Sequence, residues 1–296
     1  MRIIGELKEQ YRKGTNLLKL IYINSAVFIV MAVLQIIAVL SNSPAVSSSV
    51  AEFLALPASF SAIIQRPWTI ITYMFLHEGF FHILFNMLWL YWFGRIFSDY
   101  FDQKKLVSVY ILGGMAGALM YILSFNIFPA FSDIINVSIA MGASASVMAI
   151  VVATAAYVPD HPVSLLFIGR VKIKYIALGI FLLTSIFDFS VNTGGKIAHI
   201  GGAALGYFYA YRFKQGKDTG KWINQTIDTI ATWFKPRKKK MKVSYRKPMT
   251  DYEYNEMKAD HQAQINKILE KISTGGYDSL TKKEKEILFK ESQKKK

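Results

Sequence analysis

The sequence predicts an all-α membrane protein, in which six transmembrane helices form a bundle and a small cytoplasmic helical extension follows at the C-terminal end. Three observations lead to this fold class. The chain has 296 residues, of which 52% are hydrophobic, and this fraction is too high for an ordinary soluble domain. Several stretches approach the roughly 20 apolar residues that cross a bilayer core of about 30 Å. The formal net charge of +15 is unevenly spread, and much of it follows residue 212, where no long apolar run occurs.

Six apolar runs are long enough to be considered as spans, and the last is short and rich in small residues. They cover residues 18–40, 79–98, 106–127, 141–158, 174–190 and 197–212. The runs divide the chain into a cytoplasmic N-terminal segment, a six-span domain, a basic juxtamembrane linker and a small helical tail, at residues 1–17, 18–212, 213–249 and 250–296.

The lysines and arginines predict the orientation of these spans. One set of loops is rich in them: Arg2, Lys8, Arg12, Lys13, Lys19, Arg95, Lys104, Lys105, Arg170, Lys172, Lys174, Arg212, Lys214, Lys217 and Lys221. The loops on the opposite side offer little more than Arg66 and Lys196. The positive-inside rule therefore places both termini in the cytoplasm.

A first group of polar residues stands at the start of the second span, in "HEGFFHILFN". His82 and Asn86 are four residues apart, so they share one helix face, and both can donate hydrogen bonds. Taken alone, they are most simply read as ties between neighbouring helices. His77 and His82 are five apart and no carboxylate is suitably spaced, so we expect no metal there. The chain has no cysteine, which excludes disulfides and thiolate metal sites, and we expect no cofactor.

Two further polar groups stand at the starts of the fourth and sixth spans, in "GASA" and "AHIGGAALG". Ser144 lies among glycine and alanine, for which close helix packing is the default explanation. Gly202 and Gly206 form a small-xxx-small pair that also allows close approach. His199, taken alone, could be a satisfied core residue.

The predicted topology changes this reading. The second, fourth and sixth spans all enter the membrane from the outer side, so the three groups fall at one depth. A serine within reach of a histidine is a nucleophile with its general base. His82 and Asn86 would then offer donors to the charge that develops on a carbonyl oxygen during acyl transfer. Asp188 is the only nearby candidate for an acidic third member, so something else must orient the His199 ring.

These residues resemble the rhomboid intramembrane serine proteases, over nearly all of residues 60–212. The resemblance is carried by His-x4-His-x3-Asn, Gly-x-Ser and Ala-His-x-Gly-Gly, in that order and spacing. It implies a rhomboid-type bundle in which Ser144 is the nucleophile and His199 the base, and in which His82, Asn86 and the Ser144 N–H form the oxyanion hole. The supporting residues would be His77 at the mouth of the site, Gly142, Gly201 and Gly202. In the family the residue after the nucleophile is usually glycine, and here it is Ala145.

The resemblance also implies a function, a serine endopeptidase that hydrolyses peptide bonds in or near transmembrane segments of other membrane proteins. The loop at 191–196 would be part of the gate over the site, which would face the extracytoplasmic side of a bacterial plasma (inner) membrane. One alternative is a catalytically weak or inactive rhomboid-like protein that binds membrane proteins for quality control. Another is a small transporter, although the spans contain no inverted repeat or paired carboxylates.

The C-terminal part differs in kind from the spans. The segment 235–247 carries a dense basic cluster, which could attract anionic lipids or simply be a solvated linker that enforces topology. We expect the bilayer and membrane-protein substrates as partners, and no nucleic acid. Beyond residue 250, helical periodicity places Ile265, Ile268, Leu269 and Ile272 on one face. A capping box from Thr281 to Glu284 then starts a second short helix.

Overall fold

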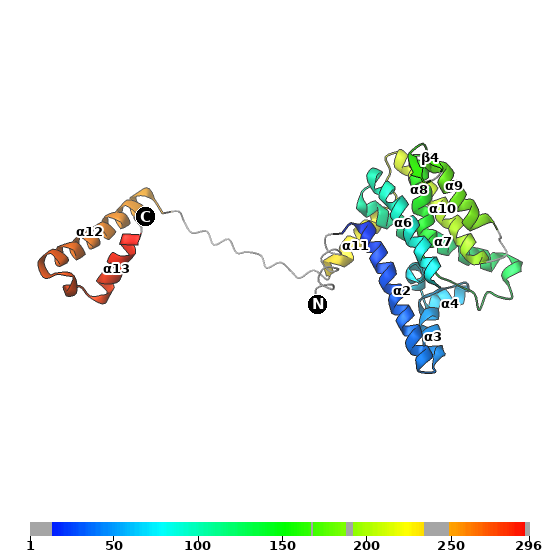
Figure 1. The fold of residues 1–296 in the computed structure, drawn as a ribbon, viewed down its shortest axis with the longest axis horizontal. Helices are drawn as coiled ribbons and strands as arrows, with labels where there is room; N and C mark the ends of the chain where they lie inside the picture. The colour runs from blue at the N-terminus through cyan, green and yellow to red at the C-terminus, as the bar shows by residue number, and fades with distance from the viewer. Residues whose placement is uncertain (1–13, 167, 188–191, 234–248, 294–296) are drawn as a thin grey trace. The chain divides into compact units, whose positions relative to one another are not determined.

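The computed structural model describes residues 14–166, 168–187, 192–233 and 249–293, and these residues are mostly helical (Figure 1). The chain divides into two compact units, residues 1–235 and 236–296. In the first unit the helices are α2 (Asn16–Leu40), α3 (Pro44–Leu54), α4 (Phe60–Gln65), α5 (Thr69–Thr72), η1 (Tyr73–Phe75), α6 (Phe80–Tyr100), α7 (Gln103–Ile127), η2 (Pro129–Phe131), α8 (Ser144–Tyr157), α9 (Ile173–Phe181), the π-helical η3 (Leu182–Ile186), α10 (Thr193–Lys214) and α11 (Lys221–Trp233).

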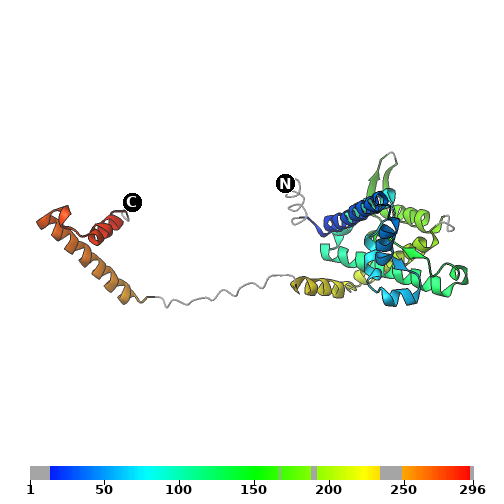
Figure 2. The same cartoon turned by 90° about the horizontal axis from the view of Figure 1, so that it is seen from below.

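The prediction of a largely helical fold is confirmed, but a purely α description is incomplete. Two short antiparallel strand pairs are present: β1 (Leu56–Pro57) with β2 (Ile139–Ala140), and β3 (Pro162–Leu165) with β4 (Gly169–Lys172). The β3–β4 hairpin joins α8 to α9 and projects from the helices (Figure 2). Neither pair was predicted, because two to four residues are too few to show the alternation that marks a strand.

Each of the six predicted apolar runs overlaps a helical stretch, and residues 188–190 of the fifth run lie outside the described residues. Among the described residues, however, only α2, α6 and α7 are long and apolar enough to cross a membrane by length and composition. α8 and the continuous stretch of α9 and η3 are apolar but shorter. α2 leaves much of its apolar surface outside the protein core, as Leu40 at 82% and Ile29 at 60% exposure illustrate. Such a surface suits contact with lipid rather than water.

The centre of the first unit is a very close packing of α7, α8 and α10. A Cβ atom built on Gly202 would lie 2.1 Å from the carbonyl oxygen of Ala145, and one on Gly206 would lie 2.2 Å from that of Ala149. On the other side of α8, a Cβ on Gly113 would lie 2.3 Å from the Ala149 side chain. The predicted close approach of the fourth and sixth spans is therefore confirmed, since only glycine fits at these positions.

The segment between α2 and α6 is firmly anchored, although its sequence shows little periodicity. Three side chains on 66–72 cap the end of α3, whose last carbonyls have no partner within the helix. Arg66 Nη1, Trp68 Nε1 and Thr72 Oγ1 donate to the carbonyl oxygens of three consecutive residues, Glu52, Phe53 and Leu54. The pairing of Leu56 with Ala140 and of Pro57 with Ile139 then fixes the strand that leads into α8.

The second unit is a helical hairpin of α12 (Asp251–Gly275), the short η4 (Tyr277–Ser279) and α13 (Lys282–Gln293). Ile265, Ile268 and Leu280 are buried in it. Leu269, predicted on the same face, is 49% exposed, so that part of the prediction is wrong. The two helices are joined at η4, and the buried face of α12 is formed by Ile265 and Ile268. The capping box from Thr281 to Glu284 is confirmed, since each residue's backbone N–H donates to the other's side chain.

Replacing Gly206 by alanine tests the helix contact. We expect Gly206→Ala to lower the free energy of unfolding by about 1–3 kcal/mol, because the new methyl group must push α10 away from a backbone carbonyl. The matched control is Gly179→Ala in α9, where a Cβ atom would meet nothing within 4 Å. That change should be neutral or slightly stabilising, because alanine is the better helix former. Thermal unfolding in detergent measures both; equal melting temperatures would show that the close approach is dispensable.

The cap of α13 predicts a pH dependence. Hydrogen bonds from the Thr281 backbone and side chain, together with Lys271, lower the pKa of Glu284 to about 2. A lowered pKa means that the carboxylate stabilises the cap above its ordinary value near 4.5, and that this contribution is lost as the pH falls toward 2. In an NMR titration of the full-length chain, Thr281→Ala should raise the Glu284 midpoint. Thr250→Ala, which removes the equivalent cap of α12, should leave that midpoint in place; an unmoved midpoint in both variants would contradict the cap.

Candidate active site

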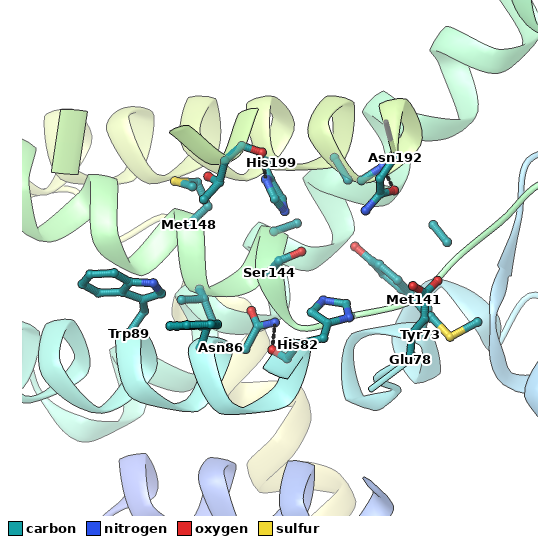
Figure 3. Close-up of a pocket in the computed structure, with 18 of the residues that line it drawn as sticks. Tyr73, Glu78, His82, Asn86, Trp89, Met141, Ser144, Met148, Asn192 and His199 are labelled. Atoms are coloured by element: carbon teal, nitrogen blue, oxygen red, sulfur yellow. Dashed lines mark hydrogen bonds between the residues drawn. The ribbon is translucent and has the colours of Figure 1, made fainter. Parts of the chain in front are cut away.

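The residues singled out from the sequence meet at a cavity of about 350 Å³ in the first unit (Figure 3). Ser144 from α8, His199 from α10, and His82 and Asn86 from α6 all line it. In Figure 3, Ser144 lies between the His199 ring on one side and His82 and Asn86 on the other. Four polar side chains from three helices therefore share one cavity within a largely apolar unit.

Ser144 occupies the first position of α8, which follows Ala143 as the N-cap. The first N–H groups of a helix have no carbonyl partner within it, and the helix dipole makes this end favourable to negative charge. Gly142 directs the chain into this position with φ +136°, a conformation that favours glycine, and its N–H donates to the carbonyl of Tyr73 at 2.9 Å. The local backbone thus places a hydroxyl beside unpaired amide donors.

The ring of His199 is held by a backbone carbonyl instead of a carboxylate. Its Nδ1 lies 3.1 Å from the carbonyl oxygen of Thr184. A carbonyl can only accept, so Nδ1 must carry the proton and Nε2 presents its lone pair. Thr184 stands in the π-helical stretch η3, where the Phe187 N–H reaches back to the Leu182 carbonyl. π-helical turns inside helices often occur at functional sites. A group other than an acid was expected from the sequence to orient the His199 ring, and the Thr184 carbonyl is that group.

Ser144 and His199 line the same cavity, but no hydrogen bond joins their side chains. Hydrogen bonds between catalytic groups are often long or poorly aligned without substrate and tighten when it binds. The arrangement brings a hydroxyl and an imidazole with a free Nε2 lone pair to the same cavity.

Asn86 is buried, and its Nδ2 donates to the carbonyl oxygen of His82 one turn earlier, at 2.8 Å. A carboxamide nitrogen has two N–H groups, so the second can serve the cavity. The His82 ring is positioned by its neighbours: a Cβ atom on Gly142 would lie 2.9 Å from its Cε1 and Nε2 atoms. The absence of a side chain at 142 therefore makes room for this imidazole.

Of the predicted supporting residues, Gly142 lines this cavity, whereas His77, Gly201 and Gly202 do not. His77, expected at the mouth of the site, is buried, lines an adjacent cavity and contacts His82 edge-to-face with ring centroids 5.2 Å apart. Gly202 packs against Ala145, and a Cβ on Gly201 would lie 2.5 Å from the carbonyl oxygen of Ala116 in α7. The two glycines support the site by letting α10 approach its neighbours.

Several cavity residues were missed. One end is lined by the apolar side chains of Trp89 and Met148, and the other by Tyr73, Glu78 and Asn192. A Trp or Met at helical spacing cannot be told from ordinary core in the sequence. Glu78 did carry a signal, as a charged residue directly between His77 and the following span.

The predicted gate is altered by the structure. Residues 193–196, expected in a loop, form the first turn of α10, and the side chain of Asn192 caps that turn by accepting from the Gly195 N–H. Asp188 and residue 191 lie outside the described residues.

Comparison with known proteins identifies the family of the chain. A family model for the Rhomboid domain matches residues 65–216, more than half of the chain. The chain therefore belongs to the rhomboid family, whose members are generally intramembrane serine proteases, and it is an integral membrane protein. Residues 250–294 match a family of unknown function, DUF6576.

A curated relative is "RHOMBOID-like protein 12, mitochondrial" of Arabidopsis thaliana. It is 28% identical over 165 residues, which are 51% of this chain and 48% of the relative. The chain thus spans about half the length of that relative, and the similarity does not extend to the whole of either protein.

Gly142→Ala tests how the cavity depends on local backbone. We expect a roughly 10- to 100-fold slower reaction of Ser144 with a fluorophosphonate probe, because alanine is strained by about 1–3 kcal/mol at this φ and its methyl would displace His82. Gly216→Ala is the matched control, with φ +75° and no atom within 4 Å of the added Cβ. It should carry similar strain without slowing the labelling. Equal labelling rates in the two variants would contradict a role for Gly142.

Proposed function

We propose that this protein is an intramembrane serine endopeptidase that uses Ser144 and His199 as a dyad. One observation carries the proposal. Ser144, His199, His82 and Asn86 all line a single cavity, and Ser144 stands there at the start of helix α8. Membership of the rhomboid family supports the same reaction class.

In the proposed mechanism each of these groups has its own step. Ser144 Oγ attacks the substrate carbonyl while His199 Nε2 accepts its proton. The oxyanion that forms is stabilised by the Ser144 backbone N–H, by the second N–H of Asn86 Nδ2 and by His82. His199 then gives the proton to the departing amine. Its bond to the Thr184 carbonyl keeps the ring in the tautomer that both transfers need.

Release of the acyl group needs water, which then takes the place of the amine and loses its proton to His199. The apolar end of the cavity, beside Trp89 and Met148, would hold the side chain of the residue at the cut. The need for water and the apolar end of the cavity both fit a substrate segment that leaves the bilayer and unwinds locally, so that its carbonyl group is presented to Ser144.

We further propose that six segments cross the membrane, namely α2, α6, α7, α8, α9 with η3, and α10. At 1.5 Å per residue, the 14 residues of α8 span only about 21 Å of a core of about 30 Å. If α8 ends at the inner face, Ser144 lies about 9 Å below the outer face. The non-helical residues 139–143 then line a recess, the one setting in which irregular backbone is tolerated at that depth.

The orientation predicted from the charges places this recess on the extracytoplasmic side and both termini in the cytoplasm. The bacterial plasma membrane stays a prediction, and the name of the plant relative says mitochondrial.

The test is cleavage of a tagged single-span substrate by the full-length protein in liposomes. Ser144→Ala and His199→Ala should each lower the rate by at least about 10³-fold, because each removes a member of a unit that acts together. Ser146→Ala is the matched control, since this buried serine of α8 lies outside the cavity and its hydroxyl has no hydrogen-bond partner. It should cut at the wild-type rate.

A wild-type protein that binds the substrate without cutting it would contradict the proposal and favour the inactive quality-control alternative. Loss of cleavage in Ser146→Ala as well would also count against the dyad, since it would point to a general effect on the fold.

A further inference from the structure

A second cavity, of about 390 Å³, adjoins the candidate active site and is built differently from it. It lies between α2, α3 and the residues just before α6. Glu78 and Met141 line both cavities, so the two spaces meet at these side chains. A substrate bound at Ser144 would therefore pass this second cavity within a few residues.

Glu78 is the only residue with a formal charge among the described residues that line either cavity. Its side chain is exposed and forms no hydrogen bond or ion pair with any described residue. The two cations predicted on the same side are engaged elsewhere, since Arg66 donates to the Glu52 carbonyl and Lys196 to the Phe187 carbonyl. The carboxylate is thus available to a cation from outside the chain.

The rest of the second cavity suits a long side chain that ends in a cation. Its walls include the apolar side chains of Phe28, Met31 and Leu76, against which methylene groups can pack. Gln35 adds a carboxamide oxygen that can accept a hydrogen bond. Apolar walls with a carboxylate at the rim match lysine or arginine, whose aliphatic stems bury while their heads stay polar.

We propose that this cavity is a specificity subsite, in which Glu78 binds a lysine or arginine of the membrane-protein substrate. The proposal rests on the proposed function for the location of the cut. Because Glu78 precedes the first residue of α6, which starts at the outer side in the predicted orientation, the basic residue would lie on the extracytoplasmic side of the scissile bond. Glu78 acts here in binding, and because its charge also acts on His82, binding has to be measured apart from cleavage.

The experiment measures binding and cleavage separately with single-span substrates. Each carries a lysine, glutamine or glutamate at one of the first six positions on the outer side of the cut. Binding is measured by energy transfer to full-length Ser144→Ala in nanodiscs of neutral lipid, and cleavage is measured with the wild type. We expect one or two adjacent positions at which lysine binds about 5- to 20-fold more tightly than glutamine.

Variants of Glu78 then identify the partner. In the same Ser144→Ala background, Glu78→Gln should abolish the preference for lysine, and Glu78→Lys should turn it into a preference for glutamate at the same position. Glu52→Gln is the matched control, because it removes a carboxylate from α3 that lines neither cavity, and the preference for lysine should survive it.

The outcomes separate the two proposals. Equal binding of lysine and glutamine at all six positions, or a preference that survives Glu78→Gln, overturns the subsite, whether or not cleavage occurs. A lysine preference that depends on Glu78, without cleavage by the wild type, supports the subsite and contradicts the protease.

Discussion

The backbones of α8 and α10 touch without a side chain between them, and the geometry of the site follows from this contact. The carbonyl oxygens of Ala145 and Ala149 occupy the space where Gly202 and Gly206 would carry a Cβ atom. Ser144 directly precedes Ala145, and His199 stands one turn before Gly202, so the register of this contact sets the hydroxyl opposite the imidazole. Apolar burial does not drive helices together in lipid, so close van der Waals packing of small residues is what can hold this register.

Main-chain carbonyl groups hold two parts of the site in place. The Thr184 carbonyl orients His199, and the Tyr73 carbonyl accepts from the Gly142 N–H, two residues before Ser144. Tyr73 is itself fixed, because its hydroxyl donates to the Gly114 carbonyl in α7 at 2.6 Å. α7 thereby supports both the loop before Ser144 and the helix that Ser144 begins. A carboxylate as orienting group would have added a charge to a nearly apolar interior, which is costly there.

The sequence was sufficient for the long apolar helices and for the three polar groups, because helical spacing and small-residue patterns leave a local signature. It did not predict the short helices α3, α4 and α5. It was not sufficient for contacts made by main-chain atoms. No residue type marks Thr184 as an acceptor for His199, and two-residue strands such as Ile139–Ala140 show no alternation. Leu269 was wrongly predicted to share the buried face of α12. Helical periodicity defines an apolar stripe that is wider than the face which one short partner helix covers. The adjacent cavity at Glu78 brings together residues from 28 to 141, a grouping that only the folded chain reveals.

Ala145 departs from the glycine usual after the nucleophile in this family, and its surroundings explain how it is accommodated. A Cβ atom built on Gly117 of α7 would lie 2.5 Å from the methyl group of Ala145. The glycine on α7 therefore leaves the space that the methyl group on α8 fills. The carbonyl of Ala145 still meets a glycine on α10, so the added methyl turns away from the α8–α10 contact. An alanine at this position therefore fits the packing of α8 against both neighbouring helices, and it lines the cavity beside Ser144.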